Sequence, residues 1–423
     1  MNSKNHPISF VRWISLLGLS ALLLAGCAAP PSTQIAQGEA TAPPTVKSAS
    51  QATPTHSPGC TVKANLPAAD PTAESLLPRL TDQDWTRGPD TAAATILEYT
   101  DFQCSGCADL AALLDRLLAK HPEDLRLAFR HYPLTIHDKA ALAVQAAEAA
   151  GKQGRFWDMH DVLFSKQESW INLSPDQFNK WVVDQAGQLN LDVDQFKQDL
   201  DSPELARLAR DAYEQNAALG MPGAPFLVVN GLPYDGPLDY GNLDALIALI
   251  SLKDRQFSDC PPMTLDPAKQ YFAVLKTEKG DITLELFADK APLAVNSFVF
   301  LANHDWFDGV TFHRVLANFM AQAGDPSGTG YGGPGYAFDN EIDPSLTFDR
   351  PGVLAMANAG PGSNGSQFFI TYSAVPHLNG GYTIFGRLID GMDVLQKLTL
   401  RDPAQSMELP PGDRIIDVEV IEK

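Results

Sequence analysis

The 423-residue chain has only five cysteines, no run of lysine and arginine, and a formal net charge of -20. The shortage of basic residues argues against a nucleic-acid partner, because phosphates would be repelled. The N-terminal apolar run, Trp13 to Ala25, is too short for a comfortable membrane span, and the composition is that of a soluble globular protein. The length predicts two or three domains.

What the N-terminus does have is the pattern of an export signal. Lys4 and Arg12 precede the apolar run, which ends in Leu24-Ala25-Gly26-Cys27. This ending resembles the lipobox of bacterial lipoprotein signals. The resemblance implies that residues 1–26 are removed and that Cys27 carries a lipid, which would place the protein outside the cytoplasm, at a cell surface or in a periplasm. An ordinary signal peptide with an incidental cysteine is the alternative.

The rest of the chain divides by composition and hydrophobic pattern. Residues 27–79, rich in Ala, Pro, Ser and Thr at their start, are expected to form a disordered tether. Residues 80–256 show strand, helix, strand, a long helical block, a hairpin and a final helix. A linker is expected at 257–269. Residues 270–423 show short strands and Gly-rich connections, which favour a closed antiparallel β-barrel with flanking helices.

Two of the cysteines form the motif Cys104-Ser105-Gly106-Cys107 between a predicted strand and a predicted helix. A helix N-terminus stabilises a thiolate, so Cys104 is the expected nucleophile and Cys107 the resolving thiol. A c-type haem site would need His at position 108, which is Ala, and a zinc site would need a second ligand pair. We therefore expect neither cofactor nor metal here. A structural disulfide remains the alternative.

A second segment, Met221 to Phe226, contains Pro225, which suits a cis bond after Ala224 beside the cysteines. Four segments together resemble a DsbA-type thiol-disulfide oxidoreductase: 101–104, 127–134, 153–160 and 223–226. The resemblance implies a thioredoxin fold with a helical insertion, and a substrate strand pairing near Ala224 and Pro225. The dipeptide Ser105-Gly106 lacks the Pro-His of strongly oxidising members, which predicts a less oxidising couple.

The remaining cysteines, Cys60 and Cys260, flank this region, and their number is even once Cys27 is set aside. We hypothesise a structural disulfide between them. Two unrelated or intermolecular thiols are the alternative.

The last 150 residues hold the groups that proline isomerisation needs. Breaking amide resonance calls for a donor near the proline nitrogen, a dry pocket for the ring, and polar groups for the flanking peptide. Segments 312–314, 319–322, 356–359 and 365–370 supply such groups in order. Together they closely resemble cyclophilin-type peptidyl-prolyl cis/trans isomerases.

The resemblance implies a role for each matching residue. Arg314 would be catalytic, donating toward the proline nitrogen. The proline pocket would consist of Phe319, Met320, Phe369 and Leu378. Gln322 would orient Arg314, Asn358 would present its backbone, and Ala357 and Gln367 would line the neighbouring wall. His377 and Tyr382 stand where many members carry Trp and His, which puts cyclosporin sensitivity in doubt.

These features together predict a membrane-tethered, extracytoplasmic folding factor with two enzymatic units. Its partners would be exported polypeptides with X–Pro bonds and cysteines, a redox partner for the Cys104–Cys107 pair, and the membrane through lipid on Cys27. A surface chaperone that binds peptides with weak turnover and a thiol reductase dedicated to one secreted partner are the alternatives.

Overall fold

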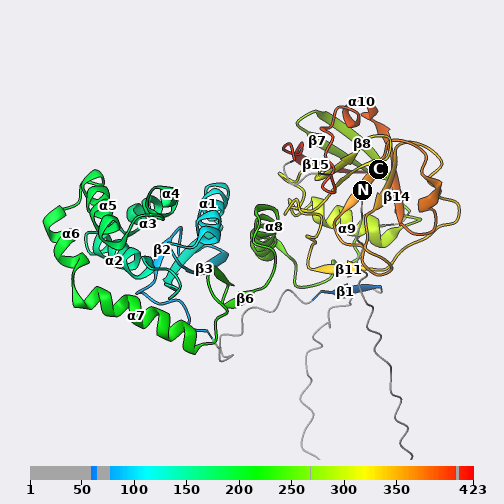
Figure 1. Cartoon of the computed structure of the whole chain (residues 1–423). Helices are drawn as coiled ribbons and strands as arrows, with labels where there is room; N and C mark the ends of the chain where they lie inside the picture. Colours follow the sequence, from blue (N-terminus) through cyan, green and yellow to red (C-terminus); the bar gives the residue numbers. More distant parts are fainter. Residues whose placement is uncertain (1–58, 64–76, 267, 406–408) are drawn as a thin grey trace, which may run out of the picture. The chain divides into compact units, whose positions relative to one another are not determined.

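A computed structural model of the chain describes residues 59–63, 77–266, 268–405 and 409–423. The expected signal peptide, Cys27 and most of the expected tether lie outside these residues. Within the described ranges, no helix is both long enough and apolar enough to cross a membrane. Two folded parts follow each other along the chain, and Figure 1 colours them from cyan and green to yellow and red.

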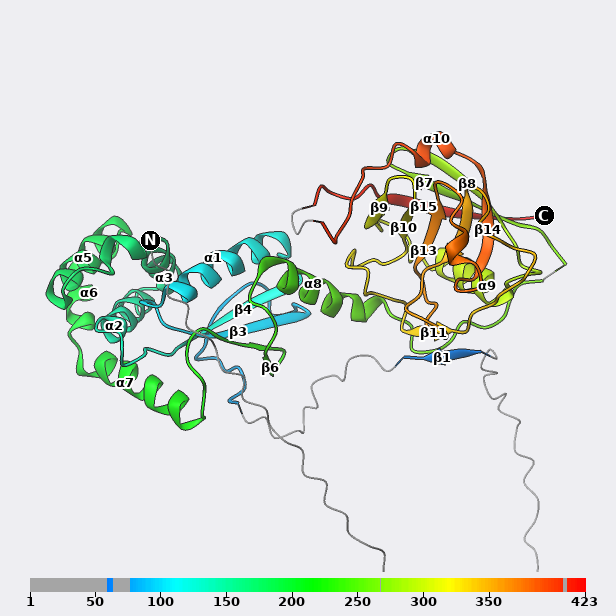
Figure 2. The same ribbon diagram turned by 45° about the vertical axis from the view of Figure 1, so that its right-hand side comes forward.

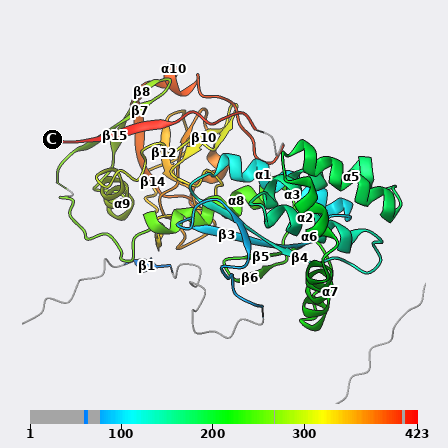
Figure 3. The same cartoon turned by 90° about the vertical axis from the view of Figure 1, so that its left-hand side faces the viewer.

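The first folded part is a five-stranded sheet with helices. Its strands are β2 (Trp85–Arg87), β3 (Ala94–Thr100), β4 (Leu125–His131), β5 (Phe226–Val229) and β6 (Leu232–Tyr234). Its helices are α1 (Ser105–Lys120), α2 (Ala140–Gly151), α3 (Phe156–Ser165), α4 (Gln167–Trp170), α5 (Pro175–Gln188), α6 (Val193–Leu200), α7 (Pro203–Ala218) and α8 (Tyr240–Ser251). The strand order is β2-β4-β3-β5-β6, and β3 and β4 are parallel. Figure 3 shows β3, β4 and β5 side by side.

The central strand β3 explains why this sheet forms. Its residues are almost all buried, as expected for a strand covered on both faces. The apolar stripe of α1 packs on it, with Leu110, Leu114 and Leu117 in one cluster with Ile96. The helices α2 to α7 are inserted between β4 and β5, so the predicted thioredoxin fold with a helical insertion is present. The hairpin expected at Asn230-Gly231 joins β5 to β6.

The second folded part is mainly antiparallel. Its strands are β7 (Tyr271–Thr277), β8 (Gly280–Leu286), β9 (Arg314–Leu316), β10 (Met320–Ala323), β11 (Tyr336–Phe338), β12 (Val353–Met356), β13 (Phe368–Thr371), β14 (Ile384–Asp390) and β15 (Ile415–Glu422). Its helices are α9 (Pro292–Ala302) and α10 (Met392–Leu395), with 3-10 turns at η1 (Leu252–Arg255), before its first strand, and η2 (Pro376–Leu378). Aromatic rings from α9, β13 and β14 meet in its core, among them Phe298, Phe368 and Phe385.

The antiparallel character of this part was predicted correctly, but a closed barrel is not seen. Eight strands run in the order β15-β7-β8-β14-β12-β13-β10-β9. Among the described residues no ladder joins β9 to β15. Two isolated bridges, Thr311 to Arg414 and Val315 to Arg401, connect the residues around β9 to the segment before β15. The sheet is therefore curved and bridged at its ends rather than closed by a continuous ladder.

The expected tether and linker need correction. Residues Cys60–Val62 form strand β1, which pairs antiparallel with β11 of the second folded part. Figure 2 shows β1 alongside β11. In the expected linker, Phe257 donates its N–H to Pro334 and packs with Cys260 against the second core. An unpaired strand edge such as that of β11 favours a partner strand because its N–H and C=O groups need hydrogen bonds.

Candidate functional sites

The thiol motif lies where the sequence placed it, between β3 and α1. Cys104 is the N-cap residue of α1, and its Sγ accepts a hydrogen bond from the Cys107 N–H at 3.3 Å. Cys104 is partly exposed, whereas Cys107 is fully buried, and both are free thiols. An accessible sulfur at a helix N-terminus with a buried sulfur one turn later is the arrangement that thiol-disulfide exchange requires.

The two thiols differ strongly in acidity. A hydrogen bond from the Cys107 thiol is the largest effect that lowers the pKa of Cys104 to about 6, and backbone N–H groups of Cys107 and Gly106 act the same way. Burial and the nearby carboxylate of Asp101 oppose this effect. The shared hydrogen bond and burial raise the pKa of Cys107, which therefore keeps its proton. Cys104 is thus a thiolate near neutral pH, and Cys107 remains a protonated thiol.

The proline loop lies beside the exposed sulfur. The peptide bond between Ala224 and Pro225 is cis. The Ala224 carbonyl oxygen is 3.7 Å from the Cys104 Sγ. A peptide that pairs with the backbone at Ala224 would therefore bring its own sulfur close to Cys104. Ala224 and Pro225 thus lie beside the nucleophile, and their pairing with a substrate strand stays a prediction.

Hydrogen bonds to the helical insertion and to the β4–α2 connection hold the loop before α1. The Asp101 carboxylate, which is buried, accepts hydrogen bonds from the N–H groups of Gln103 and Leu134 at 2.7 and 2.8 Å. The Gln167 amide donates to the carbonyl oxygens of Phe102 and Cys104. These contacts fix the backbone that carries the nucleophile.

A buried acid and histidine in the same core were missed from the sequence. Glu98 on β3 and His160 on α3 are both almost completely buried, with the Glu98 Oε1 and the His160 Nε2 separated by 3.9 Å. Burial lowers the pKa of His160, but the hydrogen bond to Asp161 and the charge of Glu98 raise it by more. An acidic residue on an otherwise apolar strand was the signal that could have revealed this pair.

Four of the expected isomerase residues lie on β9, β10 and β13, which are neighbours in the sheet: Arg314, Met320, Gln322 and Phe369. Arg314 on β9 lies opposite Gln322 on β10, which in turn lies opposite Phe369 on β13. The Arg314 guanidinium carbon is 6.0 Å from the centre of the Phe319 ring. The guanidinium therefore stands at the rim of an apolar surface, with no ion pair to an acidic residue among the described ranges.

That apolar surface contains every residue expected in the proline pocket. Met320 and Phe369 are buried, at 2% and 4% exposure, and Phe319 and Leu378 are packed against them. Phe348 stacks on Phe369 from behind, with ring centres 5.9 Å apart. The pocket floor is thus supported by a second aromatic ring, which keeps it apolar and rigid.

Beside the proline pocket, Gln322 contacts a different residue from the one expected. The Gln322 side-chain amide donates to the Gln367 Oε1 at 2.9 Å, and no side-chain hydrogen bond between Gln322 and Arg314 is seen among the described residues. Gln367 in turn donates to the carbonyl oxygens of Gly330 and Gly332. Gln322 is therefore held by its neighbour on the wall rather than by the arginine.

Asn358 and Ala357 lie at the same wall. The Ala357 N–H donates to the Gln367 carbonyl oxygen, and the Asn358 side-chain amide donates to the Gly381 carbonyl oxygen at 3.2 Å. The Asn358 side chain is thus held within this wall.

Two histidines and a tyrosine lie at or near the isomerase site: His313, His377 and Tyr382. His313 is 2% exposed, and neither ring nitrogen has a hydrogen-bond partner among the described residues. Burial lowers its pKa and keeps the ring neutral. His377 stacks near Phe319 with ring centres 6.0 Å apart, and Tyr382 meets Phe369 edge to face at 5.7 Å. Both therefore form the rim of the proline pocket.

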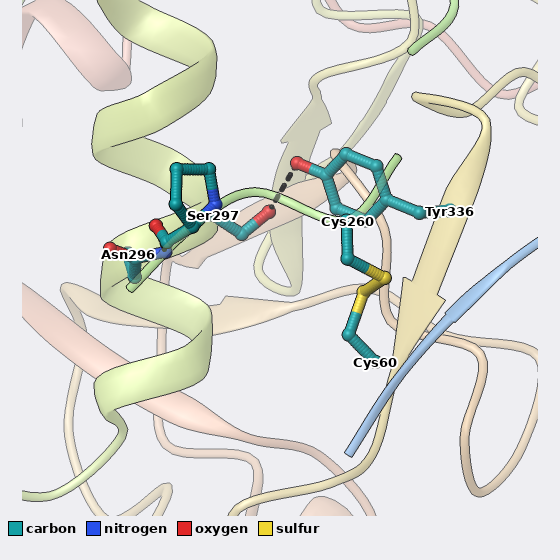
Figure 4. The surroundings of a disulfide bond; sticks show 6 residues. Cys60, Cys260, Asn296, Ser297 and Tyr336 are labelled. Carbon is teal, nitrogen blue, oxygen red and sulfur yellow. Dashed lines mark hydrogen bonds between the residues drawn. A yellow bond between two sulfur atoms is a disulfide. The ribbon is translucent and has the colours of Figure 1, made fainter. Parts of the chain in front are cut away.

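The structure joins Cys60 and Cys260 in a disulfide, as hypothesised. Figure 4 shows the bond beside α9, where Asn296 and Ser297 lie, and beside Tyr336 of β11. The Ser297 and Tyr336 hydroxyls are 3.0 Å apart. Both sulfurs thus belong to segments that pack on the second folded part, although 200 residues separate them in sequence.

Comparison with known proteins assigns both folded parts. The family model described as cyclophilin type peptidyl-prolyl cis-trans isomerase/CLD matches residues 272–420, and a family described as thioredoxin matches residues 80–248. The peptidyl-prolyl cis-trans isomerase A of Mycobacterium tuberculosis is 49% identical over 148 residues, covering 31% of this chain and 81% of that protein. The peptidyl-prolyl cis-trans isomerase B of Streptomyces anulatus is 42% identical over 172 residues, covering 37% of this chain and 98% of that protein.

A crystal structure of a Cryptosporidium parvum cyclophilin type isomerase is 39% identical, covers 36% of this chain and 98% of its own, and gives a TM-score of 0.33. The sequence relationships place the chain in a defined class. It belongs to the cyclophilin-type peptidyl-prolyl cis-trans isomerase family through its C-terminal domain. It also carries a thioredoxin-like domain, and we call the two parts the cyclophilin domain and the thioredoxin-like domain below.

Proposed function

We propose that this protein is a folding factor that isomerises X–Pro bonds with its cyclophilin domain and exchanges disulfides with its thioredoxin-like domain. The observation that carries the isomerase proposal is Arg314, whose guanidinium lies at the rim of the pocket formed by Phe319, Met320 and Phe369 and makes no ion pair with a described acidic residue. Prolyl isomerisation and disulfide exchange are two of the slowest uncatalysed steps in folding, so both domains would accelerate the folding of the same polypeptide.

The isomerase mechanism follows from the pocket. The proline ring is buried among the apolar side chains while the Ala357–Asn358 backbone holds the preceding peptide. As the amide twists, its nitrogen becomes pyramidal and gains a lone pair, to which Arg314 donates a hydrogen bond. This donation weakens the resonance behind the barrier of about 18–20 kcal/mol. No covalent bond is made or broken.

The isomerase proposal is tested with Arg314→Ala and a short X–Pro peptide. We expect kcat/KM to fall on the order of a hundredfold, the typical effect of losing one preorganised donor. Arg387→Ala is the matched control, because Arg387 is an exposed residue of the same domain that pairs with Glu285 outside the pocket. Equal activities of the Arg314 variant and the control would refute the assignment. Binding of the peptide without turnover by the unaltered protein would favour the chaperone alternative.

The thiol proposal follows from the acidity of Cys104. Its thiolate attacks a substrate disulfide, forming a mixed disulfide and releasing one substrate thiolate. Cys107 then loses its proton and attacks Cys104, which forms the Cys104–Cys107 disulfide and releases the second substrate thiol. Two electrons pass to the substrate, and the reverse sequence oxidises a dithiol.

A trapping experiment tests the thiol proposal and identifies its clients. Cys107→Ala should accumulate mixed disulfides because the resolving thiol is gone, whereas Cys104→Ala should accumulate none. Many unrelated partners support a general folding factor, and a single partner supports the dedicated reductase. Equal trapping by both variants would contradict the assigned nucleophile.

We also propose export and lipid anchoring through Cys27, supported by the sequence of the first 27 residues. In a bacterial host, the protein should incorporate labelled fatty acid and partition into detergent. Cys27→Ser should abolish both. Labelling that persists in this variant would show that another residue carries the lipid.

A further inference from the structure

A pocket of about 330 Å³ adjoins the isomerase site. Four residues that the isomerase site uses also line this pocket, which extends from them toward β1: Gln322, Ala357, Asn358 and Gln367. Its other walls are the Gly330–Pro334 loop, Tyr336, Ala337 and the segment around Ser363. Because the two sites share a wall, a peptide with its proline seated on Phe319 and Phe369 passes within side-chain reach of this pocket.

One wall of the pocket comes from outside the cyclophilin domain. Lys63 follows strand β1 and lines the pocket, although it precedes the cyclophilin family match by about 200 residues. Its backbone N–H donates to the Gly335 carbonyl oxygen at 2.9 Å, which continues the ladder between β1 and β11. The disulfide at Cys60 fixes the same strand at its other end. Lys63 is therefore held beside the substrate groove by backbone pairing and a covalent link.

Lys63 determines the charge of the pocket. It is the one charged side chain among the lining residues, all of which belong to the described part of the chain. The carboxylate of Asp325 lies behind the Gly330–Pro334 loop, is fully buried, and accepts hydrogen bonds from Ser327, Thr329 and the N–H groups of Gly330 and Gly332. The charge of Asp325 is thus engaged in the wall, whereas Lys63 is an exposed residue and makes no ion pair with a described residue.

We propose that Lys63 makes this pocket select an acidic side chain, Asp or Glu, lying within a few residues of the proline in a bound polypeptide. The inference rests on the proposed isomerase function and assigns part of its substrate preference to a segment outside the catalytic domain. A carboxylate in the pocket pairs with the ammonium and is flanked by polar and Gly-rich walls that leave room for it. A basic side chain at the same position is repelled.

The test compares peptides that differ only by Glu or Gln at one position near the proline, scanned along both flanks. For the full-length protein, we expect a two- to fivefold higher kcat/KM with Glu at the position that reaches the pocket, the range of a partly exposed ion pair. This ratio should fall to about one in Lys63→Ala and below one in Lys63→Glu. It should also decrease with added salt, which screens exposed charges.

Lys397→Glu is the control for a change of net charge. Lys397 is exposed in the turn that follows α10, pairs with Asp393, and does not line the pocket. The Glu-to-Gln ratio should be the same in this variant as in the unaltered protein. The proteins could show full isomerase activity and the same Glu-to-Gln ratio of kcat/KM in all variants at every scanned position. That result overturns the role of Lys63 but leaves the proposed function intact. Absence of isomerisation with every peptide overturns the proposed function, and the inference with it.

Discussion

Gly106 offers a direct test of how the thioredoxin-like domain sets its redox character. A Cβ atom placed on Gly106 would lie 3.9 Å from the Cys104 Sγ and 4.0 Å from Pro225, which is ordinary van der Waals contact. The residue is inside α1 and its φ is not in the left-handed region, so a larger side chain fits without backbone strain. Gly106→His would place an imidazole next to the nucleophile.

The size of the effect follows from Coulomb's law. A protonated imidazole roughly 5–6 Å from the thiolate contributes about 0.8 kcal/mol in water and about 3 kcal/mol at an effective dielectric constant of ~20. Cys104 is partly exposed and the helix N-terminus disfavours a cation, so an intermediate value of about 1.4 kcal/mol is expected. This corresponds to a decrease of about one unit in the pKa of Cys104. It raises the reduction potential by about 30 mV, because the reduced form is stabilised.

Two measurements check this prediction: thiolate absorbance against pH gives the pKa of Cys104, and equilibrium with a glutathione buffer gives the potential. Gly106→Asn is the control, because it adds a polar side chain without a charge. A folded Gly106→His protein with the pKa and potential of the control would refute the electrostatic reasoning. A potential in the unaltered protein as high as that of strongly oxidising relatives would contradict the expectation drawn from Ser105-Gly106.

Three further predictions concern both domains. Iodoacetamide should modify Cys104 at a rate that rises with pH around a midpoint of about 6, because the lowered pKa makes the thiolate dominant above that value and loses it below. Reduced protein should correspondingly lose the stability gained from this thiolate progressively as pH falls from about 9 to about 6. An alkylation midpoint near 9, or a stability that does not change over this range, would contradict the lowered pKa. Replacing Cys60 and Cys260 by Ser should lower the unfolding free energy by up to about 5 kcal/mol, which is the chain-entropy limit for a loop of roughly 200 residues. An unchanged denaturation midpoint would show that the disulfide does not stabilise the folded protein. Gly332→Ala should destabilise the cyclophilin domain, since its Cβ would lie 2.0 Å from the buried Asp325 Oδ1, and a thermal scan showing no decrease would contradict this close approach.

Much of both sites could be predicted because their residues are contiguous in sequence or belong to short motifs. The Cys104–Cys107 pair at a strand–helix junction, the loop at Pro225 and the pocket beside Arg314 lie where expected. In each case the chemistry is set by local structure: a helix N-terminus, a proline that lacks an N–H, a strand edge. Such features need only a few neighbouring residues to be recognised.

What could not be predicted depends on contacts between distant segments. Strand β1 has three residues, too few for a hydrophobic period, and its partner β11 lies about 270 positions away. The place of Lys63 beside the isomerase groove follows from that pairing together with the disulfide at Cys60. The pairing of Glu98 with His160 likewise depends on how α3 packs on β3. The bridge between Thr311 and Arg414 at the ends of the sheet depends on loops that carry no strand pattern of their own.

The bond between Cys60 and Cys260 also decides how the molecule carries mechanical load. The thioredoxin-like domain lies between these two residues in sequence, inside a covalent ring closed by the disulfide. If the N-terminus is anchored, tension on the chain passes from Cys60 across the sulfurs to Cys260 and bypasses that domain. A single proteolytic cut inside the ring would leave both catalytic domains attached to the anchor. Reduction of the bond would place the thioredoxin-like domain in series with the pull, where force could unfold it.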